Sequence, residues 1–118
     1  MAGTMASRCS AREAIELLLR PRSIAFVGAS SDATKQSGQP VRNVVAAGYG
    51  GRVYAVNRRG EPVGAVHTCR SIDEIPEPVD IGFVTVPAAQ CATAIRALGA
   101  RGVRVAVIAV GKTFKVIA

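Results

Sequence analysis

A candidate phosphate-binding loop follows the first strongly apolar run of this sequence. The run ends at Gly28, and the next residues bring hydroxyl and ammonium groups on Ser30, Ser31 and Lys35. A helix is expected from Pro40, directly after this loop. The N-terminus of a helix favours anions because its first backbone N–H groups are free and its dipole is positive there. These residue types in this order predict that the loop binds phosphate.

A basic loop follows the next apolar run. Asn57, Arg58 and Arg59 come directly after Val56, where NAD-binding proteins place an acidic residue that holds the ribose hydroxyls. Two guanidinium groups favour a phosphorylated ribose instead, and both NADP and coenzyme A (CoA) carry one. The alternative interpretation is that the two arginines belong to a solvated turn, since most charged residues lie at the surface without a ligand.

Two other nucleotide-binding patterns are incomplete. The dinucleotide fingerprint GxGxxG needs glycines at positions that hold Ser30 and Ala33. A relaxed phosphate-loop pattern ends at Lys112 and Thr113, but an apolar strand-like run precedes it and few residues follow it. We therefore expect neither a standard NAD site nor a nucleoside triphosphate site.

The cysteines and the single histidine give little indication of metal or nucleophile chemistry. Cys9, Cys69 and Cys91 form no CxxC pair, which argues against both a disulfide framework and a cysteine-based zinc site. His67 and Cys69 share one face of a predicted strand, but the sequence nearby offers neither further ligands nor an orienting group. We expect these side chains to pack or to face solvent.

Strands and helices alternate along the chain, and they must position these loops. The predicted strands cover residues 23–28, 52–56, 63–68, 80–86 and 103–110. The predicted helices begin at the capping-box residue Ser10, at Pro40, at a second capping box from Ser71 and at Pro87. This order predicts a Rossmann-like α/β fold, with a doubly wound, parallel, five-stranded sheet between two helical layers. Ligands of such folds bind beyond the carboxyl ends of the strands.

Composition narrows the class of partner. The 118 residues hold 15 Lys and Arg against 8 Asp and Glu, a formal charge of +7 that suits an anionic partner. With aromatic residues at 4% and no Trp, there is little material for stacking nucleic-acid bases, and we expect no nucleic-acid partner. No apolar run approaches the roughly 20 residues that cross a bilayer, so we expect a cytoplasmic protein without a membrane partner.

The chain length suits one domain. We expect residues 1–9 to be a disordered leader and residues 10–118 to form a single domain with its core at about 20–111. Residues 112–118 are expected to form a C-terminal tail.

Four segments together resemble a known family. They are the run Arg20-Pro-Arg-Ser-Ile-Ala-Phe-Val-Gly-Ala-Ser30, the pair Val56-Asn57, the segment from Ile75-Pro76 to Val79-Asp80, and the turn Val86-Pro87-Ala88. The combination resembles the N-terminal CoA-binding domain of ADP-forming acyl-CoA synthetases, similar to the alpha subunit of succinyl-CoA ligase. The resemblance implies that the first loop holds the CoA phosphates and that Asn57 and Arg59 lie near the adenosine. It also implies that the Val-Pro-Ala turn and the end of the fifth strand complete the pocket.

The resemblance also implies what this chain lacks. Members of the family continue after the fifth strand with Gly-Phe and an acidic segment, then a domain with a phosphorylated histidine, whereas this chain reads Gly-Lys-Thr-Phe-Lys-Val-Ile-Ala from residue 111. We therefore expect binding of CoA or acyl-CoA without turnover, with a separate ligase subunit or domain supplying catalysis. The alternatives are a truncated, non-functional remnant and an NADP-binding Rossmann protein. The predicted binding site, without catalytic or metal-binding residues, comprises Gly28, Ala29, Ser30, Ser31, Lys35, Val56, Asn57, Arg58, Arg59, Val86, Pro87, Ala88 and Val110.

Overall fold

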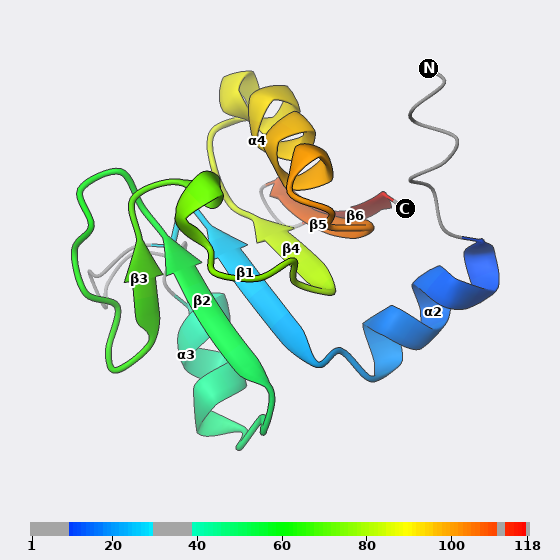
Figure 1. The fold of residues 1–118 in the computed structure, drawn as a ribbon, viewed down its shortest axis with the longest axis horizontal. Helices are drawn as coiled ribbons and strands as arrows, with labels where there is room; N and C mark the ends of the chain where they lie inside the picture. Colours follow the sequence, from blue (N-terminus) through cyan, green and yellow to red (C-terminus); the bar gives the residue numbers. More distant parts are fainter. Residues whose placement is uncertain (1–9, 30–38, 111–112, 118) are drawn as a thin grey trace.

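The computed structural model describes residues 10–29, 39–110 and 113–117, and these residues form one mixed sheet with helices on both sides (Figure 1). The strands are Ser23–Val27 (β1), Arg52–Val56 (β2), His67–Cys69 (β3), Ile81–Val84 (β4), Val105–Val110 (β5) and Thr113–Ile117 (β6). The helices are Ala11–Leu19 (α2), Gln39–Ala46 (α3), Ala88–Ala100 (α4) and the 3₁₀ turn Ile72–Glu74 (η2).

The strand order is β3-β2-β1-β4-β5-β6, and β1 to β5 are all parallel to their neighbours. This confirms the predicted doubly wound, Rossmann-like sheet. The chain moves outward from β1 to β3 in one direction and then returns to place β4 on the other side of β1. The strand order therefore reverses between β1 and β4, which is where ligands of open α/β sheets bind.

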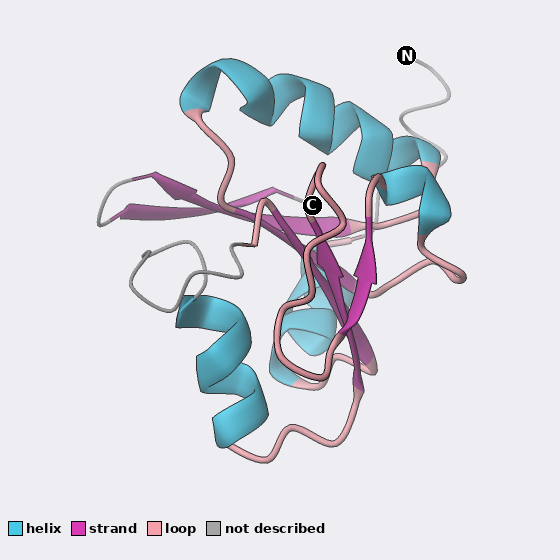
Figure 2. Ribbon diagram, turned by 90° about the vertical axis from the view of Figure 1, so that its left-hand side faces the viewer, coloured by secondary structure: helices cyan, strands magenta, loops and turns pink. Residues whose placement is uncertain are grey.

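Side chains alternate between the two faces of the sheet, and each face has its own helices (Figure 2). Val27 belongs to the core cluster that α4 and η2 cover. Phe26 faces the other way and packs with Val41 of α3. Ile24 contacts both that second cluster and the cluster around Ala14 of α2, so α2 and α3 cover the same face. The three-layer arrangement expected from the alternation of elements is present.

The C-terminal segment differs from its prediction. The sequence predicts a tail from residue 112, whereas Thr113–Ile117 forms β6, antiparallel to β5 from Val110↔Thr113 to Ala106↔Ile117. The described part of the sheet therefore has six strands rather than five. Thr, Phe, Val and Ile are typical strand formers, but a run of five residues is too short to show a clear period.

The third strand is shorter and later than predicted. The sequence predicts a strand over 63–68, but β3 begins only at His67. Gly64 takes a φ of 58°, and the Val66 N–H donates to the Val63 carbonyl at 3.2 Å, which closes a turn. The residues before β3 therefore form a turn instead of a strand, because Gly64 takes the left-handed conformation that interrupts an extended chain.

The two predicted capping boxes have different outcomes. The Ser10 hydroxyl accepts from the Glu13 N–H at 3.1 Å and the Glu13 carboxylate accepts from the Ser10 N–H at 3.2 Å, so the first box is confirmed. The second is wrong: Ser71 caps nothing with its side chain, and the Glu74 carboxylate accepts from the Arg70 N–H at 3.0 Å. With only three residues, η2 is a single 3₁₀ turn rather than an α-helix.

Candidate functional site

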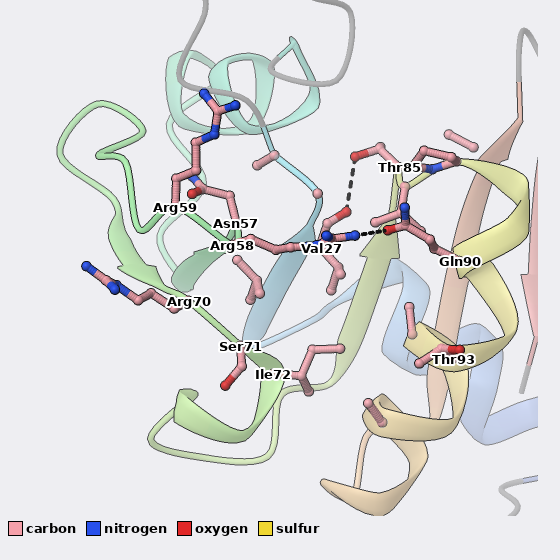
Figure 3. A pocket seen from close by; sticks show the side chains of 18 of the residues that line it. Val27, Asn57, Arg58, Arg59, Arg70, Ser71, Ile72, Thr85, Gln90 and Thr93 are labelled. Carbon is pink, nitrogen blue, oxygen red and sulfur yellow. Dashed lines mark hydrogen bonds between the residues drawn. The ribbon is translucent and has the colours of Figure 1, made fainter.

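A large open cleft of about 1410 Å³ lies at the carboxyl ends of β1, β2 and β4 (Figure 3). It exceeds the roughly 300–1,000 Å³ of most small-molecule pockets. The cleft brings together most of the residues that the sequence predicts as a binding site. The predicted residues that line it are Gly28, Ala29, Val56, Asn57, Arg58, Arg59, Val86, Pro87 and Ala88.

Four predicted residues are not among those that line the cleft as the structure describes it: Ser30, Ser31, Lys35 and Val110. Ser30, Ser31 and Lys35 lie outside the described residues, so their role stays a prediction. Val110 ends β5, opposite Thr113 of β6. Its neighbour Ala109 lines the cleft, and the role of Val110 stays a prediction.

Gly28 forms the floor of the cleft where β1 ends. Its φ is 88°, and a Cβ atom added here would lie 2.8 Å from Cγ1 of Val86 and 3.2 Å from Oγ1 of Thr85. The Gly28 N–H donates to the carbonyl of Val56 at 2.8 Å, and the Thr85 hydroxyl donates to the carbonyl of Val27 at 3.1 Å. A glycine is required here both for the left-handed turn and for the close approach of the β4 end.

Asn57 shapes the loop that follows β2. Its Nδ2 donates to the Glu61 carbonyl at 2.9 Å, and its Oδ1 accepts from the Glu61 N–H at 3.0 Å. The Asn57 N–H in turn donates to the carbonyl of Cys69 at the end of β3. The side-chain amide therefore closes the loop that carries Arg58 and Arg59.

The two arginines of this loop point in different directions. Nη2 of Arg58 donates to Oε1 of Gln90 at 3.0 Å, across the end of β1, as the dashed line in Figure 3 shows. Nη1 of Arg59 lies 3.4 Å from Oε1 of Glu61, and the Arg59 side chain is 85% exposed. The loop therefore presents one cation across the cleft and one at its rim.

Arg70 is a third cation at the cleft that the sequence analysis missed. It follows Cys69 directly, and its side chain crosses the backbone of Gly60, where an added Cβ would lie 2.8 Å from Nε. Its position immediately after a strand was the available signal, because the carboxyl ends of parallel strands share one edge of the sheet. The misplaced third strand concealed it.

Two helices direct their N-termini at the cleft. Gln39, Pro40 and Asn43 of α3 line one wall, and Ala88 and Ala89 begin α4 on the other. Pro87 precedes α4 and has no side-chain acceptor with which to cap the first N–H groups. These free donors favour an anion in the cleft.

The remaining candidates differ in burial: His67 is exposed, Cys91 is partly buried and Cys69 is buried. His67 lies edge-on to the Tyr54 ring, with 5.4 Å between ring centroids. Cys69 is buried, and burial, helped by the charge of Glu74, raises the pKa of its thiol. Cys91 places Sγ 3.6 Å from the carbonyl of Val86. The described residues hold no group of three or more metal-ligating side chains.

Residues 105–110 form a strand rather than the curled loop that a nucleoside triphosphate site needs. Among the helices that the structure describes, none has the length and apolar content needed to cross a bilayer.

Comparison with known proteins gives a consistent group of relatives. Residues 22–116 match the family described as CoA binding domain. The chain is 32% and 35% identical to the alpha subunits of the ADP-forming acetate–CoA ligases I and II of Pyrococcus furiosus, over 77% and 80% of its length. It also resembles the apo structure of dinucleotide-forming acetyl-coenzyme A synthetase 1 of Ca. Korarchaeum cryptofilum, at a TM-score of 0.74 and 32% identity over 78% of this chain.

The chain spans about a fifth of each of these relatives: 21% and 20% of the two alpha subunits and 20% of the synthetase. The family match covers residues 22–116 of this chain, and most of each relative has no counterpart in these 118 residues.

Proposed function

Because the chain belongs to the CoA binding domain family, we propose that it binds CoA or an acyl-CoA in the cleft at the carboxyl ends of β1, β2 and β4. The observation that carries the proposal is the meeting of three features at one cleft. These are the glycine turn at Gly28, the arginine-bearing loop after β2 and the uncapped N-terminus of α4.

The residues present fit a long ligand with several phosphates. The Gly28 turn brings the end of β1 close to the end of β4, so a diphosphate over this turn would lie near the free N–H groups at the start of α4. Arg59 lies after β2, where Rossmann-type proteins hold the ribose, and a guanidinium suits the 3′-phosphate of CoA. The open volume of about 1410 Å³ leaves space for the pantetheine arm along α4, past Thr93 and Ala97.

We propose that the chain binds the thioester carrier and leaves the chemistry to other parts of a ligase. His67 of β3 contacts the Tyr54 ring of β2 and is not among the residues that line the cleft. Ligation of an acid to CoA with ADP formation would need a phosphate-carrying residue and a nucleotide site from another domain or subunit. The names of the relatives, two of which are alpha subunits of ADP-forming ligases, support such a partner.

Calorimetric titration with CoA, dephospho-CoA and NADP tests the proposal. We expect CoA to bind, dephospho-CoA to bind at least about tenfold more weakly because it lacks one charge-assisted contact, and NADP to bind more weakly than CoA. Absence of binding at millimolar CoA would refute the proposed function. Tighter binding of NADP than of CoA would favour the redox alternative.

A thermal melt with CoA separates a binding domain from a non-functional remnant. At a CoA concentration 100 times the dissociation constant, a ligand that binds only the folded state adds about 2.7 kcal/mol to the free energy of unfolding. We expect one cooperative transition whose midpoint rises with CoA. A broad transition that CoA does not move would support the remnant interpretation.

A further inference from the structure

One cation of the cleft is held by a neutral side chain on the opposite wall. Arg58 leaves the end of β2, yet its guanidinium reaches Gln90 in the first turn of α4, with Nη2 and Oε1 3.0 Å apart. Figure 3 shows the Arg58 side chain lying across the cleft beside Val27, the last residue of β1. The hydrogen bond links the two walls over the point where the strand order reverses.

Among the described residues, the neighbouring arginine has a carboxylate as its partner and Arg58 has none. Arg59 forms an ion pair with Glu61 within its own loop. Within the part of the chain that the structure describes, Arg58 has no carboxylate within ion-pair distance, and its hydrogen-bond partner is an uncharged amide. A guanidinium has five N–H donors, so the contact with Gln90 leaves Arg58 with donors and a full charge for an anion.

The place of the guanidinium indicates which anion it meets. In Rossmann-type folds the diphosphate lies over the end of the first strand, and the ribose of the adenosine lies at the end of the second. Arg58 starts at the second position but carries its charge over the first, beside the N-terminus of α4. Arg59 remains at the end of β2.

We propose that Gln90 is a positioning residue that holds Arg58 across the cleft, and that Arg58 there binds the diphosphate of the ligand. Arg59 meets the ribose phosphate, with its charge offset by Glu61. This division of roles rests on the proposed function, since it concerns the same cleft and the same ligand.

The size of each contribution follows from the contacts. Arg58 and Gln90 are both exposed, so the hydrogen bond between them is weak by itself, and removal of its acceptor should weaken binding by only about two- to fivefold. Removal of Arg58 deletes a charge-assisted contact to phosphate and should weaken binding by at least about tenfold.

The test measures CoA and dephospho-CoA binding by calorimetry for the wild type and for R58A, R59A, Q90M and the double variant R58A/Q90M. R96A is the matched control, because Arg96 is an exposed arginine on the same helix as Gln90 and does not line the cleft. Thermal melts show that each variant is folded. We expect R58A to weaken binding of both ligands by the same factor, R59A to weaken binding of CoA only, and R96A to leave both affinities within about twofold.

Gln90 is tested through its coupling to Arg58. If Gln90 acts by positioning, Q90M weakens binding in the wild-type background and adds nothing in the R58A background. Equal additional losses in both backgrounds would overturn the positioning role. An R58A penalty that disappears with dephospho-CoA, or tighter binding by R58A, would overturn the assignment to the diphosphate. If the wild type binds no CoA, the proposed function itself fails, and that result is separate from these.

Discussion

Arginines at the amino ends of the strands differ from Arg58 at the carboxyl ends in the partners they have. At the amino ends of the strands, Arg22 is paired with Asp80 and Arg52 with Glu77. At the carboxyl ends, Arg58 crosses an open cleft with only an amide as its partner among the described residues. The total charge of the sequence does not distinguish arginines that are paired within the fold from an arginine that faces a cleft without a carboxylate partner among the described residues.

The amino-end network joins segments that are far apart in the chain. Asp80 accepts from the Arg22 backbone N–H at 2.8 Å and from its Nε at 3.3 Å, which ties the start of β1 to the start of β4. Glu77 accepts from both Arg52 and the Tyr54 hydroxyl, and thereby ties β2 to the segment before β4. These contacts hold the starts of β1, β2 and β4 together, and each of the two guanidinium groups already has a carboxylate as its partner.

Substitutions at the two ends should therefore have different consequences. Changes at the amino end should lower the free energy of unfolding and leave affinity for CoA nearly unchanged. Changes at the cleft should lower affinity, whatever they do to stability.

The largest expected effect comes from Leu98, which belongs to the helix that both ends share. Leu98 is 1% exposed and packs over Gly82 of β4, where an added Cβ would lie 2.6 Å from Cδ1. Leu98→Ala should lower the free energy of unfolding by about 3 kcal/mol, measured by urea denaturation, because it leaves a cavity. If the Leu98→Ala variant does not fold, Leu98→Val, which removes less side-chain volume, replaces it in the measurement. Binding of CoA by the folded fraction should change little, and a parallel loss of affinity would show that the two ends cannot be separated.

Gly28→Ala is the next largest change and acts at the cleft. A left-handed conformation costs a residue with a Cβ about 1–3 kcal/mol, and here the added atom also meets Val86. We expect CoA affinity to fall by at least about tenfold, because the backbone turn at the floor of the cleft, over which the diphosphate is proposed to lie, must shift. Gly48→Ala is the matched control: its φ is 80°, but its Cβ would meet nothing within 4 Å, and it does not line the cleft. Equal affinity losses in the two variants would contradict a local role for Gly28.

Most of the fold was predictable because its elements are regular. The parallel strands are apolar runs of five or six residues at β1, β2 and β5, and Ser10 begins α2 with a complete capping box. The two errors in strand prediction lie in short segments, where the local sequence pattern was ambiguous. Gly64 turned the start of the predicted third strand into a loop, and β6 was too short to be distinguished from a tail.

The site was predictable at the level of loops and less so at the level of contacts. The rule that ligands bind at the carboxyl ends of parallel strands placed Gly28, Arg58 and Pro87 at one cleft. The sequence contains no indication that Gln90 accepts from Arg58, or that Arg70 crosses Gly60, since both contacts depend on the three-dimensional spacing of loops.

Tyr54→Phe is a smaller test and acts at the amino end alone. The Tyr54 hydroxyl donates to Oε2 of Glu77 at 2.5 Å, and this bond, together with burial, raises the pKa of Tyr54. Removal of the hydroxyl should lower the free energy of unfolding by about 1 kcal/mol, measured by urea denaturation. CoA affinity should stay within about twofold, since the contact lies at the far end of the strand from the cleft. A loss of CoA affinity greater than twofold would contradict the view that contacts at the amino ends of the strands leave the cleft unchanged.

The smallest expected effect is confined to acid pH and concerns Glu77. Hydrogen bonds from Arg52 and Tyr54 lower the pKa of this carboxyl below its ordinary value of 4.5. A carboxyl whose pKa is lower in the folded state stabilises the fold above its unfolded pKa, and this contribution disappears as the pH falls through the folded pKa. Glu77→Gln should therefore lower the melting temperature by a few degrees at pH 7 and by progressively less below about pH 4.5, where the wild type also loses the charge. Glu16→Gln, which removes an exposed carboxyl from α2, is the control. If the difference in melting temperature between wild type and Glu77→Gln stays constant from pH 7 to pH 3, the negative charge of Glu77 does not contribute to folding stability.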